Sequence, residues 1–337
     1  MTLGLGIDTS FDDTAVSLVE DGRTILANLT VSQFAEHEEF GGVLPERASR
    51  LHIQQIFPLL DAAFQKAGRV PTALDYVAVT HEPGLMGSLL VGAAVGKAVA
   101  MALQKPLIGV NHLEAHVFAA WMDDETLKPP FLTLLISGAN TILLDCRDFD
   151  DFRLVGGTLD DAVGECLDKC GRALGLSMPA GPALQELALK GNPRALRLPR
   201  PMLNKDNFDF SFSGLKTAVA YALRDNPELP PPDVAAALLA AAAEVLSKKT
   251  LRAAEMLGHD TIVVCGGVAA NLQIREACDQ LAENSGKQMV YPSLALCTDN
   301  AAMIAGLGWF HFKKGKRSAW DLPVRALTTW KRLHQPK

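Results

Sequence analysis

Short apolar runs separated by polar turns open the chain and predict a β-meander. Strands are expected over Leu3–Ile7, Ala15–Val19 and Thr24–Val31, with a polar turn at residues 8–14. A further β-branched run, Tyr76–Thr80, enters a glycine-containing turn and the small-residue helix Ser88–Leu103. A strand, a glycine turn and a helix N-terminus together form a natural anion site, because unpaired N–H groups face the ligand.

The same order recurs in the second half. Strands are expected over Phe131–Ile136, Ile142–Cys146 and Phe152–Val155, and Thr261–Cys265 then enters a glycine turn before the helix Leu272–Asn284. Strand–glycine–helix units occur in any α/β fold, but their repetition after two meanders favours a duplicated α/β domain. We therefore predict two lobes with a ligand in the cleft between them.

Helical periodicity fills the intervals between these units. The expected helices are Ala48–Ala67, Gly109–Trp121, Asp160–Leu174, Pro182–Leu189 and Val234–Leu257, the last with Asp233 as its N-cap. We divide the chain into an N-terminal lobe at 1–130 and a C-terminal lobe at 131–337. The second lobe carries a helical insertion at about 160–255. A return of the chain to the first lobe near its C-terminus is compatible with this division.

Composition places the chain among ordinary globular proteins. It has 337 residues, of which 48% are hydrophobic and 21% charged, and this excludes disorder over most of its length. The formal net charge of −6 excludes tight binding to nucleic acid or anionic membrane through bulk charge. The basic tail, residues 313–337, is expected to be a solvated and partly frayed end.

The N-terminus and the cysteines indicate a cytoplasmic protein. The first eight residues lack a basic start and already include Asp8. The most apolar stretch, 88–103, contains Lys97 and is shorter than the ~20 residues of a membrane span. The six cysteines form no CxxC pair, and Cys166 and Cys170 are interpreted as packing residues in a reduced protein.

The pair His112 and His116 is the sharpest chemical feature. Two histidines four residues apart lie on one face of a helix and can share a metal ion. Glu114 lies on another face, so the arrangement differs from HExxH proteases and excludes a protease site. Asp299 begins an apolar helix, where it can be an N-cap or a third ligand; two histidines and a carboxylate suit Fe²⁺ or Zn²⁺.

Two glycine turns and an acidic segment are weaker signals. The turns 137–141 and 266–271 are candidate phosphate-binding loops, and neither is a P-loop. Asp161, Glu165 and Asp168 share one helix face, where like charges cost stability unless something binds them. The aromatic loop 210–217 contains Lys216 and either contacts a nucleotide or anchors a loop.

These motifs together resemble a known family. The chain is similar to bacterial tRNA N(6)-adenosine threonylcarbamoyltransferases, the TsaD family, formerly called O-sialoglycoprotein endopeptidases. The resemblance runs from Leu5 to about Gly306 and rests on ordered motifs: GIDTSFDDT, FGGVLPERASRLH, PGLMGSLLVGAAVGKA, NHLEAH, TLDDAVGECLDK, LPRPM, FDFSFSGLKT, CGGVAAN and CTDNAAMIA. It implies the duplicated actin/Hsp70/sugar-kinase (ASKHA) fold, in agreement with the repeat.

The resemblance also implies an activity. The family transfers a threonylcarbamoyl group from threonylcarbamoyl-adenylate to N6 of the adenosine 3′ of the anticodon, in tRNAs reading codons that begin with A, and releases AMP. It implies one divalent metal ion per subunit, Fe²⁺ in preference to Zn²⁺. The implied partners are tRNA, a metal-free homologous TsaB-type subunit and a small TsaE-type P-loop ATPase, with a homodimer left open and no membrane.

Site residues are carried over position by position. The implied metal ligands are His112, His116 and Asp299. The implied acyl-adenylate contacts are Leu135, Ile136, Ser137, Gly138, Ala139, Asp168, Gly181 and Asn271. Asp12 and Asp13, in the first polar turn, are our candidates for orienting or deprotonating the attacking amine.

Several positions depart from the family pattern. The usual Ser-Gly-Gly-His-Thr is here Ser-Gly-Ala-Asn-Thr at 137–141, and Phe11-Asp12-Asp13 replaces Cys-Asp-Glu. Ala180 replaces a glycine, so that Ala139 and Ala180 are expected to loosen the nucleotide site. These changes motivate the alternative of a catalytically weakened nucleotide-binding scaffold subunit; a sugar kinase on the same fold has no support from the metal ligands.

Overall fold

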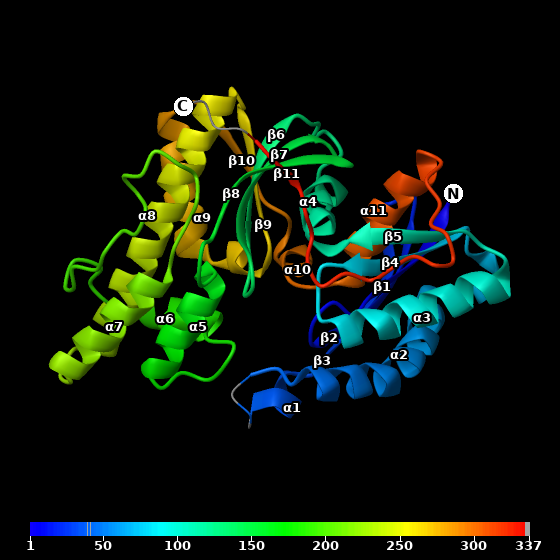
Figure 1. Ribbon diagram of the computed structural model, residues 1–337, viewed down its shortest axis with the longest axis horizontal. Coiled ribbons are helices and arrows are strands. Elements are labelled where there is room, and N and C mark those ends of the chain that lie inside the picture. The colour runs from blue at the N-terminus through cyan, green and yellow to red at the C-terminus, as the bar shows by residue number, and fades with distance from the viewer. Residues whose placement is uncertain (39, 41, 334–337) are drawn as a thin grey trace. The chain divides into compact units, whose positions relative to one another are not determined.

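The computed structural model describes residues 1–38, 40 and 42–333 (Figure 1). Gly41, in one of the motifs quoted above, and the end of the basic tail lie outside the described residues. The chain forms two compact units. The first combines Met1–Leu127 with Thr298–Thr329, and the second combines Lys128–Cys297 with Trp330–Lys337. The division inferred from the sequence, 1–130 and 131–337, differs from these units at residues 128–130 and at residues 298–329, where the chain has returned to the first unit.

The first unit is built on a five-stranded sheet. Its strands are β1 (Leu3–Asp8), β2 (Asp13–Glu20), β3 (Thr24–Ser32), β4 (Tyr76–Glu82) and β5 (Leu107–Asn111), in the order β3-β2-β1-β4-β5. The pairs β1–β2 and β2–β3 are antiparallel, whereas β1–β4 and β4–β5 are parallel. The predicted meander is confirmed.

Helices cover both faces of this sheet. The first unit contains α1 (Phe34–Glu38), α2 (Pro45–Ala67), a short 3₁₀ helix (Pro71–Ala73), α3 (Met86–Leu103), α4 (His112–Asp123) and α11 (Ala301–Lys313). In β1, Leu3, Leu5 and Ile7 join the apolar core formed with α2. The alternate residues of β1 face α11, and a Cβ atom at Gly6 would lie 2.2 Å from the carbonyl oxygen of Ala301. Glycine is therefore needed for α11 to lie this close to the strand.

The second unit repeats this topology. Its strands are β6 (Phe131–Ile136), β7 (Thr141–Asp148), β8 (Asp151–Gly157), β9 (Thr261–Cys265), β10 (Gln288–Val290) and β11 (Lys331–Arg332). The sheet order is β10-β9-β6-β7-β8-β11, so β6 to β10 occupy the places that β1 to β5 hold in the first sheet. The antiparallel and parallel pairings correspond as well. The predicted duplication of one α/β unit is confirmed by this strand order.

Most helices of the second unit belong to the interval between β8 and β9. They are α5 (Val163–Ala173), α6 (Gly181–Ala188), α7 (Ser213–Asp225) and α8 (Pro231–Leu257); η2 (Gly267–Ala270), α9 (Leu272–Asn284) and α10 (Leu294–Cys297) follow. In Figure 1, α8 and α9 run side by side, and these two helices contact each other extensively. The alanine-rich face of α8 forms much of the apolar core of this unit.

Two local predictions are wrong. The helix expected at Gly109–Trp121 begins only at His112, because residues 107–111 form the short edge strand β5 and Asn111 is the N-cap. Asp233 is not the N-cap of α8, which begins at Pro231; its Oδ1 instead accepts a hydrogen bond from the amide of Asn192 at 2.7 Å. In the tail, Lys331 and Arg332 pair with β8 and are both exposed.

The helix α3 is long and apolar enough to cross a membrane by length and composition alone. In this fold the helix packs against α2 and the first sheet. Its small residues Gly92 and Gly96 contact Thr9 and Val79 closely. Packing inside the first unit accounts for the small-residue face of α3, whereas Leu90 and Met101 on the same helix are exposed.

Candidate active site

The helix α4 presents the two histidines on one face. Asn111 caps its N-terminus, and its Oδ1 accepts hydrogen bonds from the amides of Leu113 and Glu114 at 2.9 and 3.2 Å. This cap starts the helix at His112, so that His116 follows one turn later. The rings of the two histidines lie edge to face, with centroids 4.7 Å apart. His112 is 8% exposed and His116 1% exposed.

Asp299 joins these histidines from the other end of the chain. The N-cap of α11 is Asn300, whose Oδ1 accepts from the amide of Met303 at 3.0 Å, so Asp299 is not the cap. Its carboxylate is thereby left to face α4. Asp299 Oδ1 lies 3.1 Å from His116 Nε2 and 3.5 Å from His112 Nε2.

This group has the geometry of a metal site. The three ligand atoms all lie within 4.8 Å of one another. Two bonds of 2.0–2.1 Å at a tetrahedral angle separate their donor atoms by about 3.3 Å, which matches the separations from Asp299. Two imidazole nitrogens and one carboxylate oxygen suit Fe²⁺ or Zn²⁺ and leave coordination positions open. The residues therefore fit a divalent metal ion, as the sequence predicted.

The charges of the group are strongly coupled. Burial alone would raise the pKa of Asp299, but the facing His112 and His116 outweigh it and hold this pKa well below its usual range. Burial lowers the pKa of His112, whereas Asp8 and Asp299 raise it well above its ordinary value. Burial dominates at His116 and lowers its pKa. These directions place a proton on His112, between the carboxylates of Asp8 and Asp299, and a metal ion would take the place of that proton.

Asp8 is a functional residue that the sequence reasoning missed. It lies at the end of β1, is 1% exposed, and places Oδ2 3.1 Å from His112 Nδ1. A carboxylate behind a ligating histidine fixes the ring so that the other nitrogen faces the metal. The alternation of β1 contained the signal, because Gly4, Gly6 and Asp8 share one face of the strand.

Asp12 lies in the turn that follows β1, and Asp13 is the first residue of β2. Both are half-buried, and burial raises the pKa of each. For Asp13 the pKa reaches about 7, because burial and the negative charges of Asp299, Asp12 and Asp8 outweigh a hydrogen bond from Ser32. The charge of Asp299 acts on both residues, which places the acid pair in the electrostatic field of the candidate metal group.

In the second unit, the first glycine turn is an exposed loop. Ser137 Oγ accepts hydrogen bonds from the amides of Ala139 and Asn140 at 3.3 and 3.1 Å, which fixes the turn. Gly138 and Ala139 are exposed. The side chains of Leu135 and Ile136 are fully buried, so these two residues can offer a ligand only backbone atoms.

The other predicted adenylate residues lie on segments connected to this loop. The N-terminus of α5 approaches it so closely that a Cβ at Gly164 would lie 2.5 Å from the carbonyl oxygen of Ser137. Asp168, on α5, accepts a hydrogen bond from the amide of Ala180 at 2.8 Å and so fixes the start of α6. Gln185 Oε1, on α6, accepts from the amide of Leu272 at 2.7 Å. Asn271 caps α9 through its Oδ1, 3.1 Å from the amide of Ile274.

The methyl group of Ala180 does not reach a ligand surface. Ala180 is fully buried. A Cβ atom added at Gly171 would lie 2.3 Å from the Cβ atom of Ala180. The methyl therefore packs against Gly171 of α5. Of the two alanine departures, only Ala139 is exposed.

Neighbouring cations and donors neutralise the acidic segment before and within α5. Lys169 contacts Asp161 and Glu165 at 3.5 and 2.6 Å, and Lys216 contacts Asp161 at 2.6 Å. Asp160 accepts hydrogen bonds from Ser211, Phe212 and Ser213. Lys216 therefore anchors the aromatic loop 210–217 to this segment, and the two lysines balance the charges of Asp161 and Glu165.

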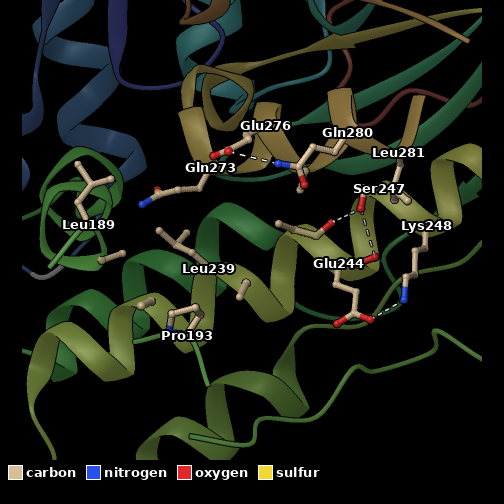
Figure 2. A pocket seen from close by; sticks show the side chains of 15 residues that line it. Leu189, Pro193, Leu239, Glu244, Ser247, Lys248, Gln273, Glu276, Gln280 and Leu281 are labelled. Carbon is tan, nitrogen blue, oxygen red and sulfur yellow. Dashed lines mark hydrogen bonds and ion pairs between the residues drawn. The ribbon is translucent and has the colours of Figure 1, made fainter. Parts of the chain in front are cut away.

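A cavity of about 660 Å³ in the second unit lies away from these residues. Figure 2 shows it between α8 and α9, with Glu244 and Lys248 on one side and Gln273, Glu276 and Gln280 on the other. Its floor is formed by alanines of α8. None of the predicted site residues lines this cavity.

Comparison with known sequences identifies the family. The family described as tRNA N6-adenosine threonylcarbamoyltransferase, TsaD, matches residues 24–306. A protein of that name from Carboxydothermus hydrogenoformans is 47% identical over 318 residues, which cover 94% of this chain and 95% of the relative. A protein of the same name from Thermotoga neapolitana is 44% identical over 311 residues, covering 92% and 94%.

Solved structures agree on the fold. HypF from T. kodakarensis has a TM-score of 0.64 at 15% identity, over 93% of this chain and 48% of that chain. Component A of the (R)-2-hydroxyglutaryl-CoA dehydratase of Acidaminococcus fermentans has a TM-score of 0.57 at 16% identity, over 93% and 99%. The predicted ASKHA-type fold is thereby confirmed. The family match, the identity to relatives of similar length and this fold show that the chain belongs to the TsaD family of tRNA N6-adenosine threonylcarbamoyltransferases.

Proposed function

We propose that this chain transfers a threonylcarbamoyl group from threonylcarbamoyl-adenylate to N6 of the adenosine 3′ of the anticodon, in tRNAs reading codons that begin with A. The observation that carries the proposal is the intact His112–His116–Asp299 group in a chain of the TsaD family. In the reaction the C–N6 bond forms, the anhydride C–O bond to the phosphate breaks, and AMP leaves with the electron pair.

His112, His116 and Asp299 would hold one Fe²⁺ ion, or Zn²⁺ as the second choice. Such an ion supplies Lewis-acid polarisation of a substrate oxygen when it is bound. Asp8 keeps the ring of His112 oriented through its 3.1 Å contact with Nδ1.

Asp12 and Asp13 would orient the attacking amine and accept its proton. A general base works best when its pKa lies near the working pH, and burial raises that of Asp13 to about 7. The amine proton would move to a carboxylate oxygen of this pair as the C–N6 bond forms.

The loops of the second unit would hold the AMP portion of the acyl-adenylate. Gly138 and Ala139 are exposed beside the N-terminus of α5, and the N–H of Gly138 would donate to the phosphate, because the amides of Ser137 and Ala139 already donate within the turn. The backbone of Leu135, Ile136 and Gly181 and the side chains of Asp168 and Asn271 would complete this site.

We further propose that the chain acts in the cytoplasm with a metal-free homologous TsaB-type subunit and a small TsaE-type ATPase. Packed helices α2 and α3 expose large apolar side chains, with Ile53 and Phe57 on α2 and Leu90 and Met101 on α3 each 56–58% exposed. An apolar surface of this kind suits a protein partner. A homodimer is the other outcome that a mass measurement would distinguish.

The direct test is transfer of labelled threonylcarbamoyl from its adenylate to tRNA, with and without the two partners. We expect transfer by the wild type, and loss of both metal and transfer in His112→Ala. Asp12→Ala and Asp13→Ala are expected to keep the metal and lose transfer, because these residues are not ligands.

The outcomes separate the candidates. A chain that binds neither iron nor zinc and transfers nothing would be a nucleotide-binding scaffold, as the altered turns at 11–13 and 137–141 suggest. Normal rates in both Asp12→Ala and Asp13→Ala, with metal unchanged, would remove the acid pair from the mechanism.

A further inference from the structure

A buried histidine of α2 bridges the two sides of the turn that carries Asp12 and Asp13. His52 is 0% exposed, and its Nε2 lies 3.1 Å from the carbonyl oxygen of Phe11. Its Nδ1 lies 2.7 Å from Thr14 Oγ1. One ring therefore contacts the residue before the acid pair and the residue after it.

The neighbours fix how this ring carries its proton. A carbonyl oxygen only accepts, so Nε2 carries the hydrogen and donates to Phe11. Burial lowers the pKa of His52, so the ring is neutral near pH 7 and Nδ1 is an acceptor. Gln33 Nε2 faces Nδ1 at 3.1 Å and donates to it.

Gln33 extends the contact to the acid pair itself. Its backbone N–H donates to the carbonyl oxygen of Asp12 at 3.1 Å, and its side chain is 0% exposed. His37 Nε2 lies 3.3 Å from Gln33 Oε1, which keeps the amide nitrogen of Gln33 turned toward His52. Thr14 Oγ1 has one hydrogen, which it donates either to His52 Nδ1 at 2.7 Å or to Gln55 Oε1 at 2.8 Å, and Nδ1 accepts from Gln33 in the second case.

The backbone of residues 11–14 sets where the two acids lie, and one side-chain hydrogen bond, from Ser32 to Asp13, adds to it. Asp13 Oδ1 is buried and has no hydrogen-bond partner among the described residues. A displacement of about 1 Å at a reacting group costs on the order of 100-fold in rate. The hydrogen bonds that hold residues 11–14 therefore decide where the two carboxylates lie.

We propose that His52 is a positioning residue for the transfer reaction: it fixes the turn at Phe11 and Thr14 and so places Asp12 and Asp13. The inference rests on the proposed function, in which the acid pair handles the amine proton. The hydrogen-bond partners of His52 in the described part of the chain are Phe11, Thr14 and Gln33, none of them a candidate metal ligand.

Three variants test the Nε2 contact and the Nδ1 contact of the ring separately. His52→Gln retains a donor near the position of Nε2, for Phe11, and His52→Asn retains a polar group near Nδ1, for Thr14 and Gln33. His52→Leu removes both contacts at similar volume. The matched control is His259→Gln, which changes another buried histidine, one that pairs with Asp145 at 2.8 Å in the second unit.

The measurements are transfer kinetics with the partners, metal content, and amide hydrogen exchange of peptides covering residues 9–14 and 32–34. For His52→Leu we expect kcat to fall about 10–100-fold, with KM for both substrates within about threefold of wild type. Metal content should be unchanged, and exchange should rise only in those two peptides. His52→Gln and His52→Asn should be intermediate, and they keep the test decisive if His52→Leu does not fold.

Several results would overturn the positioning role. One is a kcat within about twofold of wild type in His52→Leu or, if that variant does not fold, in both polar variants. Another is an equal loss in His259→Gln at an equal shift in Tm, which would show general destabilisation. A wild type that transfers nothing with its partners would overturn the proposed function instead, and the exchange data would still show whether His52 holds the turn.

Discussion

At the scale of single residues, the candidate metal group depends on two caps. Asn111 begins α4 so that His112 and His116 share a face, and Asn300 begins α11 so that the carboxylate of Asp299 is left for those histidines. In both cases an asparagine side chain accepts hydrogen bonds from the first free N–H groups of the helix. Asn111 directly precedes the ligand His112, and Asn300 directly follows the ligand Asp299. Local backbone chemistry thus positions side chains that are 183 residues apart in the chain.

The protonation of Asp13 gives a testable pH dependence. Folding raises its pKa from 3.8 to about 7, so the folded chain binds this proton more tightly than the unfolded chain. The resulting stabilisation is complete below about pH 4 and is lost as pH rises through about 7. In metal-free protein, the free energy of unfolding of wild type should therefore fall relative to that of Asp13→Asn between pH 5 and 8, by on the order of 1–2 kcal/mol.

Urea unfolding of chelator-treated protein at the two pH values measures this difference. Asp61→Asn, at an exposed position on α2, is the matched control and should show no comparable change. If Asp13→Asn differs from wild type by the same amount at pH 5 and pH 8, Asp13 is ionised throughout this range.

The residues of the site were predictable to different degrees. The spacing of His112 and His116 indicates a shared helix face, because helical geometry alone fixes it. No local pattern connects these histidines with Asp299. Its assignment as the third ligand rested on the family resemblance. Asp8 was missed because its role depends on which face of β1 turns toward α4 and α11, and that is set by packing across the sheet.

At the scale of elements, short segments were the hardest to predict. Residues 107–111 read as the start of a helix because five residues are too few to show strand alternation. The start of α8 was misplaced because Pro231 and Pro232 occupy its first turn, where the missing N–H groups cost nothing. Long periodic segments such as α2 and α9 were predicted within a few residues.

The contact between α3 and β4 supplies a prediction at this scale. A Cβ atom at Gly96 would lie 2.0 Å from Val79 Cγ1, whereas one at Gly214 of α7 would meet nothing within 4 Å. Gly96→Ala should destabilise the protein by about 1–3 kcal/mol, because overpacking forces the helix from the sheet. The same change at Gly214 should be neutral or stabilise by up to about 1 kcal/mol.

Thermal or urea unfolding of the two variants checks this expectation. The pair is matched, since each adds one methyl group to a helical glycine. Equal stabilities would mean that α3 can move away from β4 at no cost, and the account of its small residues as packing residues would be wrong.

At the scale of the whole molecule, the duplication was readable because both halves keep the same order of strands and glycine turns. The return of the chain to the first unit near its C-terminus was predicted only in general terms. Its position at Thr298 depends on α11 covering the glycine face of β1, a contact between residues about 300 positions apart.

The charge of the molecule predicts how it handles tRNA. The net charge is −6, and several basic side chains of the C-terminal region are already engaged: Lys314 and Arg317 lie 4.6 and 4.2 Å from the rings of Phe310 and Phe312. We expect the chain alone to bind tRNA weakly, with affinity falling at least about tenfold between 50 and 200 mM salt. Addition of the partner subunits should strengthen binding.

Fluorescence anisotropy with labelled tRNA at the two salt concentrations, with and without partners, tests this expectation. Nanomolar binding by the isolated chain at 200 mM salt would show instead that it carries a tRNA surface of its own.

The return of the chain to its first unit has a consequence for biosynthesis. The unit begins at Met1 but is completed only by Thr298–Thr329. At 5–20 residues per second, a ribosome needs about 10–30 s to make the roughly 170 intervening residues. Through that interval α11 is missing from the glycine face of β1, and His112 and His116 lack the carboxylate of Asp299. The half that is made first is therefore finished last, and loading of the proposed metal follows the synthesis of the second unit.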